Sequence, residues 1–228
     1  LNGSGIAVLN MPFEADGLYN TTDFSGYGNN GTTLGLTHNN TGGYDGNGTY
    51  KFAGTSTSYV QVDKFKNWPD STISVAFWIK TAGSGDGIVS YASSQNDNMF
   101  LLFEPNNIVV YVRGITSTTG IDVNDDKWHH VVITWDDATN DVKGYKNGAL
   151  VHEGTLTTTA MQANGCFVVA QESDDVCGGY DSAQALPGNV DDLLIFNRTI
   201  TAQQVSALYR NRTDLIVSQE TIVGNNWT

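Results

Sequence analysis

The chain has 228 residues, of which 39% are hydrophobic and 15% charged, and its 11 basic and 24 acidic side chains give a net charge of -13. The apolar fraction is large enough to form a core, and the charged fraction is too low for a disordered acidic chain. The scarcity of Lys and Arg argues against nucleic acid and anionic membrane surfaces as partners. No run of 18 apolar residues occurs, so the sequence predicts no direct membrane insertion.

Apolar and polar residues alternate with a period of two along much of the chain, which is typical of strands with one buried face. We expect strands at residues 6–9, 50–52, 59–62, 73–80, 87–91, 99–103, 108–112, 129–135, 142–146, 150–153, 167–171 and 190–196. Asn147-Gly148 between two of them predicts a type I′ hairpin turn. About a dozen strands with short connections predict an all-β sandwich of two antiparallel sheets.

One segment near the C-terminus has a helical pattern instead. Thr201 and Gln204 form a capping box, and Val205, Leu208 and Tyr209 follow at helical spacing. The sequence therefore predicts one short helix at residues 201–210, packed on the sandwich. We expect residues 1–214 to form the sandwich domain and residues 215–228 to be a terminal strand or a linker to a following domain. Residues 1–10 lack basic side chains and do not resemble a signal peptide.

Cysteines and sequons indicate the compartment. Asn-x-Ser/Thr occurs at Asn2, Asn20, Asn30, Asn39, Asn47, Asn197, Asn211 and Asn226. These sequons favour a glycosylated surface on an extracellular or cell-surface protein. The only two cysteines are Cys166 and Cys177. They are either unrelated thiols or a disulfide, and we expect the disulfide because free thiols rarely persist in an oxidising compartment.

Several motifs in fixed order resemble the laminin-G-like family, over roughly residues 5–212. They are Asp23-Phe-Ser-Gly-Tyr-Gly-Asn-Asn-Gly31, Thr72-Ile-Ser-Val-Ala-Phe-Trp-Ile-Lys80, Lys127-Trp-His-His-Val-Val-Ile-Thr-Trp135, Gly144-Tyr-Lys-Asn-Gly148 and Gly188-Asn-Val-Asp-Asp-Leu-Leu-Ile-Phe196. The resemblance implies a concanavalin A-like jelly roll of two antiparallel sheets with one short C-terminal helix.

Two stretches resemble the calcium loops of pentraxins in particular. They are Ser90-Tyr-Ala-Ser-Ser-Gln-Asn-Asp-Asn98 and Gln171-Glu-Ser-Asp174, the latter followed by Gly178-Gly-Tyr-Asp-Ser-Ala-Gln184 and Leu186-Pro-Gly188. The resemblance implies one or two Ca²⁺ ions. Asp97 and Asn98 would supply side-chain oxygens, and Glu172 and Asp174 would bridge two ions. Ser173 would offer its backbone carbonyl, and Asp181 and Gln184 would complete the second ion.

The chain departs from the pentraxin pattern at three places. Ala76 and Val132 occupy the positions of the two pentraxin cysteines. Ser173 replaces a longer amide residue, although a carbonyl ligand does not depend on the side chain. The spacing from Asp174 to Gly178 is one residue longer than in pentraxins, so Asp175 is an alternative ligand. The second ion is the part of the prediction that these departures affect.

The charge of the second loop supports a cation. Residues 171–184 contain Glu172, Asp174, Asp175 and Asp181 but no Lys or Arg. Such carboxylates repel one another in a partly dry site unless a cation neutralises them. Calcium takes oxygen ligands of these types, whereas zinc would require Cys or His, of which the two loops hold only Cys177. The alternative is an ordinary solvated acidic loop.

Other residues have weaker functional interpretations. His129 and His130 alternate faces on a strand, so we expect one core and one surface histidine rather than a catalytic pair. The polar residues of 23–30 suit either a cation or Gly-rich turns. Three tryptophans in predicted strands, Trp78, Trp128 and Trp135, are expected in the core. The remaining two, Trp68 before Pro69 and Trp227, are the aromatic residues that are candidates for exposure.

The sequence therefore predicts a calcium-binding recognition or adhesion module for a carbohydrate or another polar surface ligand, within a larger chain of several domains. The alternative is a structural spacer in a cell-surface protein, with calcium serving stability only. An enzyme is disfavoured although hydrolases share this jelly roll, because the hydrolase pattern Glu-x-Asp-x-x-Glu does not occur. Glu172 and Asp174 match two of its acids but lie in the predicted metal loop.

Overall fold

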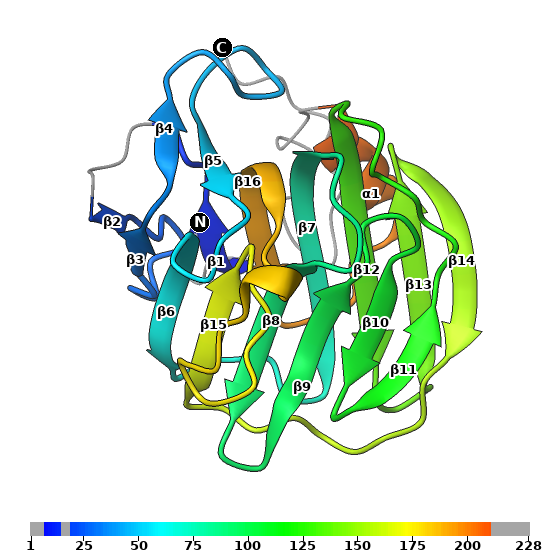
Figure 1. Cartoon of the computed structure of the whole chain (residues 1–228). Helices are drawn as coiled ribbons and strands as arrows, with labels where there is room; N and C mark the ends of the chain where they lie inside the picture. Colours follow the sequence, from blue (N-terminus) through cyan, green and yellow to red (C-terminus); the bar gives the residue numbers. More distant parts are fainter. Residues whose placement is uncertain (1–6, 15–18, 211–228) are drawn as a thin grey trace.

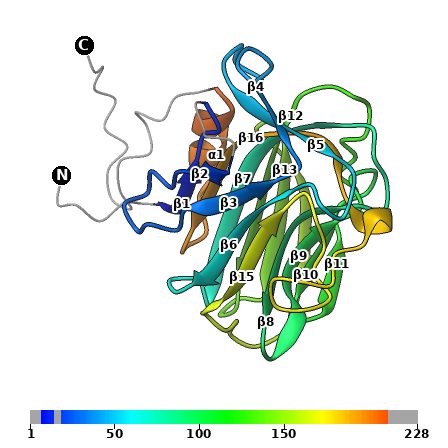
Figure 2. The same ribbon diagram turned by 60° about the vertical axis from the view of Figure 1, so that its left-hand side comes forward.

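The structure, a computed structural model, describes residues 7–14 and 19–210. Within them, sixteen strands form two eight-stranded sheets that pack against each other, and all strand pairs are antiparallel (Figures 1 and 2). The predicted all-β jelly-roll sandwich with one short C-terminal helix is confirmed. The predictions made for Asn2, Asn211, Asn226, Trp227 and the segment 215–228 lie outside the described residues.

Sheet A has the strand order β14-β13-β12-β7-β16-β5-β4, and β1 pairs with the second half of β16. Its strands are β1 (Ala7–Met11), β4 (Thr37–Asn39), β5 (Thr49–Ala53), β7 (Thr72–Thr81), β12 (His129–Asp136), β13 (Asp141–Lys146), β14 (Ala149–Thr155) and β16 (Pro187–Phe196). One α-helix, α1 (Ala202–Tyr209), packs on the outer face of this sheet.

Sheet B has the strand order β11-β10-β9-β8-β15-β6-β3-β2. Its strands are β2 (Asn20–Thr21), β3 (Gly31–Leu34), β6 (Tyr59–Phe65), β8 (Gly87–Ser93), β9 (Asn96–Phe103), β10 (Val109–Val112), β11 (Ile115–Thr118) and β15 (Gly165–Val169). A single turn of 3₁₀-helix, η1 (Ser182–Gln184), precedes β16.

The central strand β7 shows how alternation builds two apolar layers. Val75 and Phe77 point between the sheets into the main core. Ala76, between them, faces outward into a smaller cluster with Val132 and residues of α1. Ala76 and Val132 are direct partners across β7 and β12, at the two positions where the pentraxin pattern has cysteines. Apolar packing therefore occupies the place of that disulfide.

The local predictions for the turn and the helix are confirmed. Asn147 and Gly148 both have positive φ, 51° and 79°, as a type I′ turn requires. The Thr201 hydroxyl accepts from the Gln204 backbone N–H, and the Gln204 side chain accepts from the Thr201 backbone N–H. This capping box starts α1 where the sequence placed it.

Every predicted strand overlaps an observed one, but four observed strands were not expected: β2, β3, β4 and β11. They are two to four residues long and consist largely of Thr, Asn and Gly. Three of them are edge strands. At a sheet edge, the neighbouring strand determines the pairing more than the side-chain pattern of the edge strand itself does.

Two predictions about aromatic residues were wrong. Trp68 is not exposed: it is 3% exposed and stacks on Tyr91 with ring centroids 3.8 Å apart.

His129 and His130 do alternate faces, but neither is a surface residue, because they are 8% and 3% exposed. The Asp125 carboxylate and the Asn147 amide bond the two ring nitrogens of His129, whereas His130 lies beside Trp78 under α1. The other strand tryptophans, Trp78 and Trp135, are buried as expected, and Trp128 is half-buried just before β12.

The segment 23–30 adopts turns. The buried Asp23 carboxylate accepts hydrogen bonds from the backbone N–H groups of Asn10, Ser25 and Asn29 and from the Ser25 hydroxyl. Its oxygens are thus engaged in holding the turn, which agrees with the turn interpretation of this segment.

Among the described residues, no helix is long and apolar enough to cross a membrane.

We predict that Trp68→Ala lowers the free energy of unfolding by about 3–5 kcal/mol, because it empties a large aromatic site in the core. Urea unfolding followed by circular dichroism measures the change. Phe24→Ala is the matched control, since Phe24 is 63% exposed and its loss should change stability by less than about 0.5 kcal/mol. Equal effects of the two substitutions would contradict the core position of Trp68.

Candidate calcium site

The segment after β15 folds back across the outer face of sheet B. The chain reverses at Ala170, which has a φ of +67°. Ser173 then lies over β8, where its hydroxyl is 3.1 Å from that of Ser90. At the end of the segment, Cys177 forms a disulfide with Cys166 near the start of β15. The expected disulfide is thus present in the structure, and it anchors the returning loop.

A glycine makes the close approach of this loop possible. A Cβ atom on Gly87 would lie 2.6 Å from the backbone nitrogen of Glu172, closer than real Cβ atoms approach. Gly87 begins β8, so the loop rests directly on the backbone of sheet B. The sequence reasoning did not single out this residue.

A bulge in β9 brings Asp97 and Asn98 to the same side. Between the pairs Ser93–Asn96 and Tyr91–Phe100, β9 has three residues where β8 has one. Such a bulge breaks the strict alternation of a strand and re-aims side chains. The Asp97 carboxylate accepts from the Asn98 backbone N–H at 2.9 Å, and the Asn98 amide reaches the same oxygen at 3.5 Å.

Glu172 is the buried acid of the site. It is 3% exposed, and burial together with the charges of Asp174 and Asp97 raises its pKa from 4.5 to about 7. Its Oε2 atom is buried without a hydrogen-bond partner. Asp97 and Asp174, from two loops that are more than 70 residues apart in sequence, thus both act electrostatically on Glu172.

Further buried oxygens at this region lack partners. The Oδ1 atoms of Asn96 and Asn98 are both buried and without a hydrogen-bond partner. Asn98 was expected as a ligand, and Asn96 is an addition that the sequence reasoning missed. Its position two residues before Asn98 is the signal in the sequence that could have found it. Unsatisfied buried acceptors are costly and suit a bound cation or donor.

An open cleft of about 370 Å³ lies between the two loops, lined by residues 93–97 and 174–176. Asp174 and Asp175 are both exposed at its rim. Asp175 Oδ1 accepts from the Val176 backbone N–H at 2.7 Å, so one of its oxygens is already engaged. Ser173 is fully buried beside them. Asp174 and Asp175 thus both remain possible ligands.

Asp181 and Gln184 lie in a different segment. Asp181 caps η1 by accepting from the Ala183 backbone N–H, and it is exposed. Tyr180 before it packs on Tyr59 and donates to Gln61, two residues of β6. These contacts place Asp181 on the β6 side of β15, whereas Asp97 lies on β9, beyond β8 on the other side. The second ion therefore stays a prediction without a shared cluster of ligands.

The carboxylate and amide oxygens of this region suit calcium better than a metal ion that is bound by charged side chains alone. In the described part of the chain, no three His, Cys, Asp or Glu side chains form a group that could hold a metal ion. Calcium, however, also takes amide and backbone carbonyl oxygens. The unpartnered oxygens of Glu172 and Asn98 are donors of the kinds that calcium accepts.

The described sequon asparagines all lie at the surface. Asn20, Asn30, Asn39, Asn47 and Asn197 are exposed. Four of these five belong to the segment 20–47, which includes the edge strands β2 and β4. Glycans attached there would cover one side of the sandwich, away from the β8–β9 hairpin (Figure 1).

Comparison with known proteins agrees with the architecture. Residues 52–206 match the family model Laminin_G_3, described as the concanavalin A-like lectin/glucanases superfamily. The chain belongs to this family, and within it to a laminin-G/pentraxin-like type of domain.

Two sequence relatives carry pentraxin names. The chain is 35% identical over 145 residues to rat "Sushi, von Willebrand factor type A, EGF and pentraxin domain-containing protein 1", a match that covers 60% of this chain and 4% of the relative. It is 28% identical over 156 residues to rat neuronal pentraxin-1, which covers 65% of this chain and 36% of the relative. The chain thus spans only a part of the length of these relatives.

A solved structure with the same fold is domain 4 of AbnA, an extracellular arabinanase of Geobacillus stearothermophilus, in complex with arabinotriose. Its TM-score is 0.69 at 18% identity, with 90% of this chain and 99% of that chain covered. At this identity the likeness concerns the fold.

We predict that the double substitution Cys166→Ala with Cys177→Ala lowers the free energy of unfolding by about 2–3 kcal/mol, because the unfolded chain loses a closed loop. Urea unfolding measures the change. Dithiothreitol should destabilise the wild-type protein by a similar amount and leave the double variant unchanged. A wild-type protein insensitive to the reductant would contradict the bond.

A second prediction concerns Glu172 in metal-free protein. Its folded-state pKa of about 7 exceeds the ordinary 4.5, so the folded state binds the proton more tightly and loses stability as pH rises between these values. Glu172→Gln mimics the protonated form. In EDTA at pH 8 it should raise the free energy of unfolding by about 1–3 kcal/mol, and the gain should vanish below about pH 4.5.

Urea unfolding across this pH range tests the prediction. Asp70→Asn is the control, because Asp70 is an exposed acid outside both loops and should show no such pH-dependent gain. A Glu172→Gln protein that is less stable than wild type at pH 8 in EDTA would show that the carboxylate has a partner in the folded state.

Proposed function

We propose that this chain is a calcium-dependent extracellular recognition or adhesion module for a carbohydrate or another polar surface ligand. One observation supports this above all: the carboxylate of Glu172 is buried with an unpartnered oxygen, burial and the charges of Asp174 and Asp97 raise its pKa, and no Lys or Arg is within the two loops. A divalent cation is the simplest neutralising partner for such a group.

Five residues would hold the first ion. Asp97 and Asn98 would supply side-chain oxygens from β9, Glu172 and Asp174 would supply carboxylates from the returning loop, and Ser173 would supply its carbonyl. Asp181 and Gln184 would contribute to a second ion if one binds. Calcium bound at an open cleft can coordinate hydroxyl or acidic oxygens of a ligand, and the adjoining cleft between residues 93–97 and 174–176 has room for one.

Several observations support an extracellular or cell-surface setting. The Cys166–Cys177 disulfide requires an oxidising compartment to persist. The described sequon asparagines are exposed, as glycosylation at Asn20, Asn30, Asn39, Asn47 and Asn197 would need. The relative with the higher identity is by its name a protein of many domain types, and the match covers 4% of it. Neighbouring domains in a larger chain are therefore part of this proposal.

A binding role is favoured over an enzymatic one. The chain lacks the hydrolase pattern of acids, and Glu172, whose pKa burial raises to about 7, lies in a loop that suits a cation. The domain of AbnA with the same fold is described in complex with arabinotriose, which is consistent with sugar binding on this architecture. The alternative is a spacer in which calcium only stabilises the fold. It would use the same ion-binding residues as the recognition module and would differ only in binding no further ligand.

Thermal unfolding of the deglycosylated protein in EDTA and in millimolar calcium tests the ion site. A ligand at 100 times its dissociation constant adds about 2.7 kcal/mol to the native state, so the melting temperature should rise by several degrees. Asp174→Ala and Glu172→Gln should each abolish most of this rise, whereas Asp70→Asn should retain it. Wild-type protein that melts at one temperature in both buffers, with calcium removal verified by elemental analysis, would refute the site.

Glycan arrays in calcium and in EDTA separate the two functions. Binding that requires calcium and is lost in Asp174→Ala supports recognition through the ion. A calcium-dependent melting temperature without binding to carbohydrates or other surface ligands would favour the spacer.

A further inference from the structure

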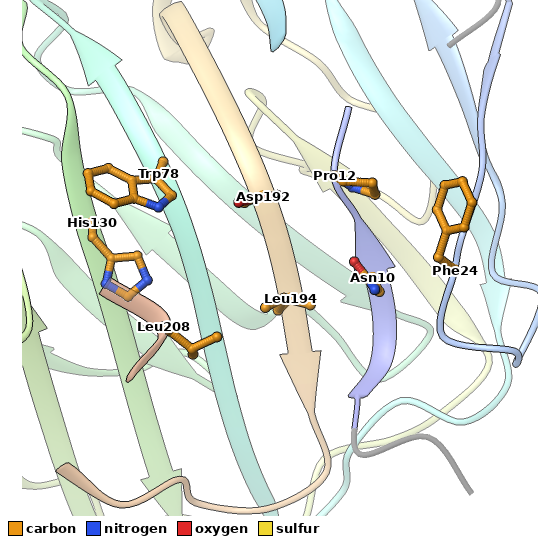
Figure 3. Close-up of a pocket in the computed structure, with 8 residues that line it drawn as sticks. All are labelled: Asn10, Pro12, Phe24, Trp78, His130, Asp192, Leu194 and Leu208. Carbon is orange, nitrogen blue, oxygen red and sulfur yellow. The ribbon is translucent and has the colours of Figure 1, made fainter. Parts of the chain in front are cut away.

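A second concave region lies on the opposite face of the sandwich, on the outer side of sheet A. This outer groove, about 370 Å³, is lined by Asn10, Pro12, Phe24, Trp78, His130, Asp192, Leu194 and Leu208 (Figure 3). Leu194 and Asp192 come from β16, with β1 on one side and β7 and β12 on the other. None of these residues belongs to the calcium loops.

A bulge turns an acid into the groove. Between the pairs Asp191–Trp78 and Leu194–Ala76, β16 has two residues where β7 has one. Asp192 is one of the extra residues, and its φ of +46° is unusual for a residue other than glycine. The consequence is that two consecutive acids are directed differently: Asp191 is fully buried, and Asp192 lines the groove.

The groove is electrostatically negative. Burial and the charges of Glu14 and Asp45 raise the pKa of Asp192 to about 6, so its carboxylate is still ionised at neutral pH. Tyr44 hydrogen-bonds to Asp192 and stacks on Trp78 at 3.9 Å, but it carries no compensating charge. None of the lining residues named above is Lys or Arg.

One polar group that lines the groove, the His130 ring, has a nitrogen without a hydrogen-bond partner. His130 is 3% exposed, and its Nδ1 atom has no hydrogen-bond partner. Burial lowers its pKa to about 4, so the ring is neutral and can accept a hydrogen bond. Apart from the amide of Asn10, the remaining wall is apolar or aromatic, formed by Pro12, Phe24, Trp78, Leu194 and Leu208.

A carboxylate and a neutral imidazole beside an apolar wall complement a cation with an apolar stem. The positive group of such a side chain pairs with the Asp192 carboxylate, and its apolar stem covers Leu194. The aromatic ring of Phe24 adds a cation–π contribution. A neutral sugar would leave the negative charge uncompensated. We propose that the outer groove binds a Lys or Arg side chain presented by another protein, independently of the calcium loops.

Capped tripeptides test this proposal on the full chain in EDTA. Acetyl-Gly-Arg-Gly-amide and acetyl-Gly-Lys-Gly-amide should shift the NMR signals of the Trp78 indole and the His130 imidazole. The citrulline peptide, a neutral isostere of the Arg peptide, should bind at least tenfold more weakly. Asp192→Asn should weaken the Arg peptide at least tenfold, because Asn tolerates positive φ but carries no charge. Asp174→Ala, in the calcium loops, should bind like wild type.

Phe24→Ala provides a second variant that does not threaten the fold, because Phe24 is exposed. It should weaken both charged peptides about threefold through the loss of aromatic contact. The proposal is overturned if the citrulline peptide binds as well as the Arg peptide, or if peptide binding leaves the Trp78 and His130 signals unmoved. It is also overturned if calcium alone or a neutral disaccharide displaces the Arg peptide from these residues.

Discussion

The fold-back of the loop after β15 is the constraint on which the candidate calcium site depends. The loop lies on Gly87 at the start of β8 with Glu172, passes Ser90 with Ser173, and brings Asp174 to the cleft beside the β8–β9 hairpin. The disulfide, the missing Cβ of Gly87 and the contact between Ser90 and Ser173 hold the loop on sheet B. They oppose the repulsion between Glu172, Asp97 and Asp174 that the folded chain creates. A cation would remove that repulsion.

Much of the fold could be predicted because its signals are local. Alternation along β7 and β12, the Asn147-Gly148 turn and the Thr201 capping box each need only a few neighbouring residues to be recognised. The short strands were missed because their pairing is decided by residues elsewhere: Thr32 of β3 faces Gln61 of β6. Trp68 was misplaced for the same reason. The Pro that follows it indicates a loop, but the stacking partner Tyr91 is 23 positions away in the chain.

The candidate site could be predicted only in part. Resemblance located Asp97, Asn98, Glu172 and Asp174, and in the structure the charges of Asp97 and Asp174 both act on the buried Glu172. Asn96 was missed because the resemblance does not mark it, and only the structure shows that its Oδ1 atom is buried without a partner. The same limit applies to Asp192. Strict alternation along Val190–Leu194 allows one of two consecutive acids to point outward, but only the pairing with β7 shows which one lines the groove.

The two bulges act in the same way on opposite faces of the sandwich. In a regular strand, neighbouring side chains point to opposite faces, so one of two consecutive polar residues would enter the core. In β9 the bulge contains Asp97 and Asn98, and in β16 the bulge contains Asp192, which lines the outer groove next to the fully buried Asp191. Because the sites lie on different sheets and share no described residue, an ion at one face and a cationic side chain at the other can bind at the same time. A module of this kind could connect a surface ligand on sheet B to a protein partner on sheet A.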